Sequence, residues 1–254
     1  MKENYPVIDG AESFFLKGNN VGLLITHGFM GTPQSVRFLG DKFSELGYTV
    51  LAPRLKGHGT HYQDLERSTS NEWFTDLEKG YTVLKEHCPT IFVIGQSMGG
   101  ALALWLANKY QDIEGLILIN AALSVPSYDQ WIGKTSPSYI SETAPDIKLK
   151  GVHEITYKKV PILSIHELQA LLKNTPGIIP KITNPILCFK SAEDHVVPPE
   201  NTDFILKHIG SNQKEAVTLS NSYHVASMDN DRELIIKKSH LYIQKLLQKV
   251  EVVL

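Results

Sequence analysis

Short apolar runs alternate with amphipathic segments along most of the chain, and this alternation predicts the secondary structure. The apolar runs occupy residues 21–26, 48–52, 91–95, 115–119, 186–189 and 216–219. Strands that are apolar at nearly every position are typical of a parallel sheet with helices on both faces. Hydrophobic residues recur with helical spacing over residues 35–46, 73–84, 102–110 and 234–247, and the first of these stripes comprises Val36, Leu39, Phe43 and Leu46. The order of strands and helices predicts a doubly wound α/β fold.

The stretch from residue 121 to residue 184 does not follow this alternation. It lacks a run that predicts a strand of the main sheet, and its prolines are Pro126, Pro137, Pro145, Pro161, Pro176 and Pro180. Apolar spacing predicts one helix there, over residues 165–173. An unstructured loop of this length is uncommon inside a compact domain. We therefore expect residues 121–184 to form an inserted cap, and residues 1–120 and 185–254 to form one α/β core.

Composition excludes several classes of protein. The chain has 254 residues, of which 42% are hydrophobic and 20% charged, so it is neither disordered nor collagen-like. Its net charge of −2 argues against a nucleic-acid partner, which would require a basic surface. The sequence contains neither an apolar run of about 18 residues, as a membrane span requires, nor an N-terminal secretory signal. With Cys88 and Cys188 as its two cysteines, we expect reduced thiols and a cytoplasmic protein.

The ten histidines do not form a pattern typical of a metal site. Only His58 and His61 lie close together in the sequence, and neither a Cys pair nor a helical His-x-x-x-His motif accompanies them. We therefore expect no metal ion and no other cofactor.

The strongest chemical signal is a G-x-S-x-G motif formed by Gly95, Ser97 and Gly99. It lies between the predicted strand at 91–94 and a predicted helix at 101–108. Such a strand–turn–helix is sharp and strained, and it holds the serine hydroxyl at the edge of the sheet. The alternative is a glycine-rich turn without chemistry, but the flanking strand and helix favour Ser97 as a nucleophile.

A serine nucleophile requires a base and a carboxylate that orients the base. Asp194 follows the strand at 186–189, at the same edge of a parallel sheet as Ser97. Glu193 is the alternative carboxylate, but the position of Asp194 before Val-Val-Pro-Pro favours Asp194.

The expected base is His224, which lies in the loop after the last predicted strand, at 216–219. The competing histidines lie elsewhere. His195 is adjacent to Asp194 and points away from it, whereas His208 and His240 lie in predicted helical segments. Chain order therefore selects His224.

An oxyanion hole requires two N–H donors near the nucleophile. We expect the backbone N–H groups of Met98 and Phe29, because Gly28 and Gly31 let the early loop approach the substrate closely. His27 and the Gly57-His58-Gly59 segment are expected to shape these loops. The residues expected to line an apolar substrate pocket are Phe29, Met30, Leu123, Trp131, Ile165 and Leu168. For the last four, simple packing of the cap on the core is the alternative.

Together these motifs resemble the α/β-hydrolase superfamily, and within it the small bacterial carboxylesterases and monoacylglycerol lipases. The matching segments are residues 27–31, 53–59, 95–100, 194–198 and 222–229. The resemblance covers nearly the whole chain and implies a mostly parallel, doubly wound sheet with a small inserted cap. It also implies Ser97 as nucleophile, Asp194 as acid and His224 as base, with the N–H groups of Phe29 and Met98 as the oxyanion hole.

The expected function is hydrolysis of carboxylic esters of small or lipid-like substrates, acylglycerols among them, through an acyl-enzyme. The alternatives are a thioesterase, an amidase or a peptidase of the same fold, and a non-catalytic binding protein. Labelling by a fluorophosphonate probe distinguishes an enzyme from a binding protein, because a binding protein stays unlabelled. The sequence leaves a monomer and a homodimer open.

Overall fold

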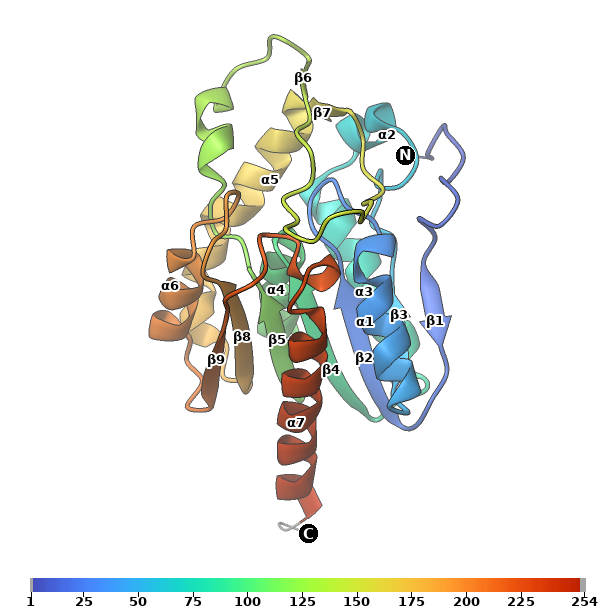
Figure 1. The fold of residues 1–254 in the computed structure, drawn as a ribbon, viewed down its shortest axis with the longest axis vertical. Helices are drawn as coiled ribbons and strands as arrows, with labels where there is room; N and C mark the ends of the chain where they lie inside the picture. Colours follow the sequence, from blue (N-terminus) through green and yellow to red (C-terminus); the bar gives the residue numbers. More distant parts are fainter. Residues whose placement is uncertain (1, 252–254) are drawn as a thin grey trace.

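The computed structural model describes residues 2–251, with side chains up to residue 248, and a seven-stranded sheet forms its centre (Figure 1). The strands in spatial order are β1 (Phe14–Leu16), β3 (Thr49–Ala52), β2 (Val21–Thr26), β4 (Thr90–Gln96), β5 (Gly115–Ile119), β8 (Ile186–Ser191) and β9 (Lys214–Leu219). Only β1 pairs antiparallel with its neighbour in this sheet. The predicted doubly wound, mostly parallel α/β fold is therefore confirmed.

Helices cover both faces of the sheet. One face carries α1 (Gln34–Glu45) and α7 (Arg232–Glu251), and the other carries α3 (Ser70–Lys85), α4 (Met98–Lys109) and α6 (Glu200–His208). The short helix α2 (Tyr62–Arg67) lies above the upper edge of the sheet. Alternate residues of the inner strands enter opposite cores. In β4, Ile91 and Val93 pack in the core with α3 and α4, whereas Phe92 and Ile94 pack in the core with α1 and α7. This two-sided burial explains why the inner strands are apolar at nearly every position.

Three details differ from the sequence-based predictions. Leu46, predicted on the buried stripe of α1, is 43% exposed, because the helix ends at Glu45 and Gly47 turns the chain with a φ of 93°. The last strand, β9, is exposed at alternate positions because it lies at the edge of the sheet. Finally, β1 has only three residues, too few to produce a recognisable pattern.

Residues 121–184, called the inserted segment below, connect β5 to β8 and contribute no strand to the main sheet. Its elements are η1 (Pro126–Trp131), β6 (Tyr139–Ser141), β7 (Lys159–Pro161), α5 (Ile162–Asn174), η2 (Thr175–Gly177) and η3 (Ile179–Lys181). The strands β6 and β7 form a small antiparallel pair, and α5 contains the predicted helix at 165–173. In Figure 1, α5, β6 and β7 lie above the upper edge of the main sheet.

Within the described part of the chain, no helix combines the length and the apolar composition needed to cross a membrane.

Candidate active site

Ser97 lies on a strained turn between β4 and α4. Its φ of 57° and ψ of −123° belong to a region that residues other than glycine rarely adopt. A Cβ atom at Gly95 would lie 2.3 Å from the carbonyl oxygen of Gly99, and a Cβ atom at Gly99 would lie 2.5 Å from that of Thr26. The turn therefore requires glycine at these two positions, and the sequence permits the sharp turn that presents Ser97.

The structure brings Ser97, His224 and Asp194 into one hydrogen-bonded row. His224 Nε2 lies 2.9 Å from Ser97 Oγ, and His224 Nδ1 lies 2.8 Å from Asp194 Oδ2. All three side chains are largely buried at the edge of the sheet, on the loops that follow β4, β8 and β9. In this arrangement a histidine can accept the serine proton while the carboxylate holds its ring in place.

Asp194 is held as a carboxylate despite its burial. Burial opposes ionisation, but the hydrogen bond and charge of His224, with two backbone N–H groups, outweigh it and lower the pKa of Asp194. The N–H donors belong to Val196 and Val197, at 2.9 and 2.8 Å from Asp194 Oδ1. The alternative carboxylate, Glu193, is exposed, and its nearest cation is Lys148, at 3.6 Å. The geometry therefore supports Asp194 over Glu193.

The competing histidines lie away from Ser97. His195 is exposed and hydrogen-bonded to Asp146, at 2.8 Å. His208 is bonded to the carbonyl of Phe204 within α6, and His240 in α7 is bonded to the hydroxyl of Tyr48. Thus, among these histidines, His224 alone is hydrogen-bonded to Ser97.

The backbone of His224 is held on both sides by residues that the sequence reasoning did not identify. Asn120 Nδ2 donates to the carbonyl of His224 at 2.8 Å, and Asp146 Oδ2 accepts from the His224 N–H at 3.1 Å. Asn120 directly follows β5, at the same sheet edge as Ser97, and that position could have marked it. Asp146 belongs to the inserted segment, where sequence patterns do not fix the position of a side chain.

Two backbone donors lie beside Ser97. A Cβ atom at Gly28 would lie 3.2 Å from Ser97 Cβ, so the loop that carries Phe29 runs directly against the nucleophile. Met98 is the first residue of α4, where N–H groups have no partner within the helix. Among residues 2–251, the N–H groups of Phe29 and Met98 have no hydrogen-bond acceptor. Both donors are thus available for a developing oxyanion.

Two buried histidines support the loop that carries Phe29. His27 Nδ1 lies 2.9 Å from the carbonyl of Gly28, and its Nε2 accepts from the N–H of Leu55 at 3.3 Å. Burial lowers the pKa of His27 to about 4 and, together with His27, lowers the pKa of His58 far below its usual value. The neutral His58 ring packs edge-on against Phe29, with 6.3 Å between ring centroids. Both histidines therefore shape this loop, as expected from the sequence.

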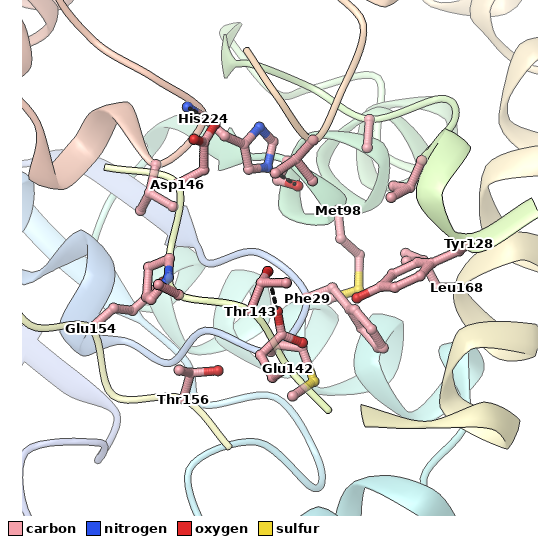
Figure 2. Close-up of a pocket in the computed structure, with 18 residues that line it drawn as sticks. Phe29, Met98, Tyr128, Glu142, Thr143, Asp146, Glu154, Thr156, Leu168 and His224 are labelled. Atoms are coloured by element: carbon pink, nitrogen blue, oxygen red, sulfur yellow. Dashed lines mark hydrogen bonds between the residues drawn. The ribbon is translucent and has the colours of Figure 1, made fainter. Parts of the chain in front are cut away.

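A cavity opens beside Ser97, and both apolar and polar side chains line it (Figure 2). The apolar part includes Phe29, Met30, Met98, Val125, Tyr128, Leu168 and Val196. The polar part includes Glu142, Thr143, Asp146, Glu154 and Thr156. Figure 2 shows Met98, Tyr128 and Leu168 on one side of the cavity and Glu154 and Thr156 on the other. The cavity thus presents two chemically different surfaces to one reactive hydroxyl.

Of the expected pocket residues, Phe29, Met30 and Leu168 line this cavity, but Leu123, Trp131 and Ile165 do not. Leu123 lines a separate outer groove, and Trp131 packs against the core. Ile165 is completely buried, because this first turn of α5 packs on α2, where Ser164 Oγ donates to the carbonyl of Leu65. The prediction that Leu123, Trp131 and Ile165 line the substrate pocket is therefore wrong.

Two carboxyl groups of the inserted segment lie in the polar part of the cavity, and no sequence signal marked them. Burial raises the pKa of Glu142 to about 7. Burial also raises the pKa of Glu154 to about 7, although the charge of His224 partly opposes this effect. Among the described residues, Glu142 Oε2 has no hydrogen-bond partner, and no cluster of His, Cys, Asp and Glu could hold a metal ion. These carboxyl groups are therefore free to contact a polar part of a substrate.

A mostly parallel sheet with a serine at a strand–helix turn, followed in the chain by an acid and then a histidine, is the α/β-hydrolase fold. Comparison with known proteins agrees. A family model described as serine aminopeptidase, S33, matches residues 20–231, and the chain belongs to this family.

Individual relatives are similar over almost their whole length. The chain is 46% identical to a thermostable monoacylglycerol lipase of Bacillus sp. (strain H-257), over 96% of this chain and 99% of that protein. It is 27% identical to a carboxylesterase of Bacillus subtilis (strain 168), over 92% and 96%. A solved structure from a study of two metagenome-derived lipolytic enzymes, LipS and LipT, superposes with a TM-score of 0.91 at 40% identity, over 94% of this chain and 100% of that one. The predicted resemblance and the predicted class, a serine hydrolase of carboxylic esters, are confirmed.

Proposed function

We propose that the protein hydrolyses monoacylglycerols and related esters that join one acyl chain to a small polar alcohol. The observation that carries this proposal is the divided lining of the cavity beside Ser97. Its apolar part suits a single acyl chain, and Glu142 and Glu154 suit an alcohol with free hydroxyl groups. The 46% identity to a protein named as a monoacylglycerol lipase supports the same substrate class.

In the proposed reaction, Ser97 Oγ attacks the ester carbonyl while His224 Nε2 accepts the serine proton. Asp194 holds the imidazole and stabilises its charged form. The N–H groups of Phe29 and Met98 stabilise the oxyanion, each by on the order of 3 kcal/mol in the transition state. The C–O bond to the alcohol then breaks, and His224 donates its proton to that oxygen. Water, activated by His224, hydrolyses the acyl-enzyme and restores Ser97.

We assign the two parts of this reaction to two parts of the chain. Residues 1–120 and 185–254 form the core that carries the reacting groups, and residues 121–184 form a cap that lines the cavity with Tyr128, Leu168 and the two glutamates. All the proposed catalytic groups come from one chain, so catalysis does not depend on whether two copies associate. A reducing, cytoplasmic location would suit Cys88 and Cys188, which are buried and unpaired.

Aminopeptidase activity is the second candidate, because the family description names it and because the two buried carboxyl groups could bind a free amino group. Aminoacyl nitroanilides separate the two functions. Turnover of these amides with no turnover of monoacylglycerols would favour the peptidase.

A series of glyceryl and nitrophenyl esters with acyl chains of increasing length tests the proposal. We expect monoacylglycerols to be cleaved faster than diacylglycerols, whose second chain would face the glutamates. Replacing Leu168→Ala in the apolar part should reduce kcat/KM by about tenfold for long chains and much less for acetyl esters. The matched control is Leu163→Ala, on the same helix but 50% exposed, which should behave like the wild type. Equal losses for all chain lengths in Leu168→Ala would contradict an acyl site there.

A further inference from the structure

One carboxylate of the inserted segment bridges the two core loops that carry Asp194 and His224. Asp146 Oδ2 accepts from the N–H groups of His195 and His224, both at 3.1 Å, and its Oδ1 lies 2.8 Å from His195 Nδ1. Its backbone carbonyl accepts from the N–H of Val225, also at 3.1 Å. Figure 2 shows Asp146 beside His224 at the cavity. Asp146 therefore joins the loop after β8 to the loop after β9.

Lys148 and Leu149 of the inserted segment are also hydrogen-bonded to the loop after β9. The N–H groups of Lys148 and Leu149 donate to the two carboxylate oxygens of Asp229, at 2.7 and 2.9 Å. Asp229 also accepts from the N–H of Tyr223, which precedes the base. Residues 146–149 are thus bound to the loop after β9, which carries His224, through side-chain and backbone hydrogen bonds.

The backbone of His224 is held by both the core and the inserted segment. Its carbonyl is held by Asn120, a residue of the core, but its N–H is held by Asp146, a residue of the inserted segment. If the inserted segment moves away, the N–H side of His224 loses its acceptor and the imidazole loses part of its restraint. A shift of about 1 Å between base and nucleophile can reduce the rate a hundredfold.

We propose that Asp146 is a positioning residue: while the inserted segment is packed on the core, Asp146 keeps His224 aligned with Ser97. This inference rests on the proposed roles of Ser97 and His224. The important property is the acceptor oxygen that receives two N–H groups. An asparagine side chain retains such an oxygen, whereas alanine removes it.

The experiment measures the rate at which a small dialkyl fluorophosphate inactivates the protein, with kcat and KM for 4-nitrophenyl acetate. Both small reagents make little use of the acyl site. In Asp146→Ala the inactivation rate and kcat should fall together by about tenfold to a hundredfold, with KM nearly unchanged. Asp146→Asn should restore most of the loss. The control is Asp129→Ala, an exposed residue of η1 in the same segment, which should react at the wild-type rate.

The outcomes separate the positioning role of Asp146 from the proposed function. If folded Asp146→Ala is inactivated as fast as the wild type, the positioning role is wrong and the proposed function stands. If the wild type is not labelled, or if Ser97→Ala is labelled equally, the proposed function fails. If Asp146→Ala does not fold, Asp146→Glu replaces it, because it keeps the charge and displaces the oxygens by one methylene. A wild-type inactivation rate in Asp146→Glu would then overturn the positioning role.

Discussion

The core edge and the inserted segment line one cavity, but they are constructed differently. At the core edge, the N–H of Ser97 donates to Ile119 and the N–H of Asn120 donates to Phe189, both at 3.0 Å, so sheet pairing continues into the loops that carry the chemistry. Apart from the helix α5, the inserted segment has only two strands of three residues and several short 3₁₀ helices. The proposed reacting groups therefore lie on loops continuous with the main sheet, whereas substrate selection is proposed on a segment that adds no strand to that sheet.

The space around the glycines also differs between the core edge and the inserted segment. A Cβ atom at Gly95 or Gly99 would collide with backbone atoms, whereas Gly133, Gly151 and Gly177 in the inserted segment have no atom within 4 Å of such a Cβ. The turn at Ser97 has no free space, whereas Gly177 has room for a side chain; Gly133 and Gly151 also have room, but their φ of 71° and 79° still favours glycine. Substitutions in the two regions should therefore differ in their effects.

The largest effect is expected from Ser97→Ala, which removes the proposed nucleophile from the core edge. Ester turnover should fall by roughly 10⁴-fold or more, with an unchanged unfolding midpoint. His224→Ala should cause a similar loss, and the double variant should cost little more than either single one because the groups act as a unit. Saturating ester assays on the three variants measure this. If the fold-losses in turnover of the two single variants multiply in the double variant, the two residues act independently.

The next largest effect is expected from Gly99→Ala. The added methyl group would meet the carbonyl oxygens of Thr26 and His27 at 2.5 and 2.7 Å, so β2 and α4 must separate. We expect a loss of more than roughly 3 kcal/mol in the free energy of unfolding, and a loss of activity. The matched control is Gly177→Ala in the inserted segment, which should change stability by less than about 1 kcal/mol. Urea unfolding compares them, and similar losses would remove the contrast between the two regions.

The smallest effect is expected from Glu154→Gln and depends on pH. The pKa of Glu154 is raised from 4.5 to about 7 in the folded state, mainly by burial. Between these values the folded protein binds more protons than the unfolded chain, so this group makes stability fall as pH rises. Glu154→Gln should remove this contribution, leaving that of Glu142, and should gain up to roughly 3 kcal/mol relative to the wild type above pH 7. Urea unfolding from pH 4 to pH 8 tests this, and parallel curves would contradict it.

The grouping of the proposed reacting residues could be predicted from sequence because it depends on local patterns and chain order. Ser97, Asp194 and His224 each follow a strand, and the carboxyl ends of parallel strands share an edge. The lining of the cavity did not follow in the same way. Apolar spacing predicted α5 as a helix, but it could not predict how the helix is rotated about its own axis. As a result, Ile165 is buried in the core and Leu168 reaches the cavity, although both residues belong to the same apolar stripe.

The sequence by itself determined the order of strands and helices, the glycines that permit the nucleophile turn, and the chain order of serine, acid and histidine. These follow from hydrophobic periodicity and backbone sterics, which act over a few residues. Only the tertiary structure decided that Glu142 and Glu154 enter the cavity and that Asp146 holds the N–H of His224. The contact of Asp146 with His224 joins residues 78 positions apart, and both glutamates lie in a segment without regular repeats. Only the packing of the inserted segment on the core could therefore establish these positions.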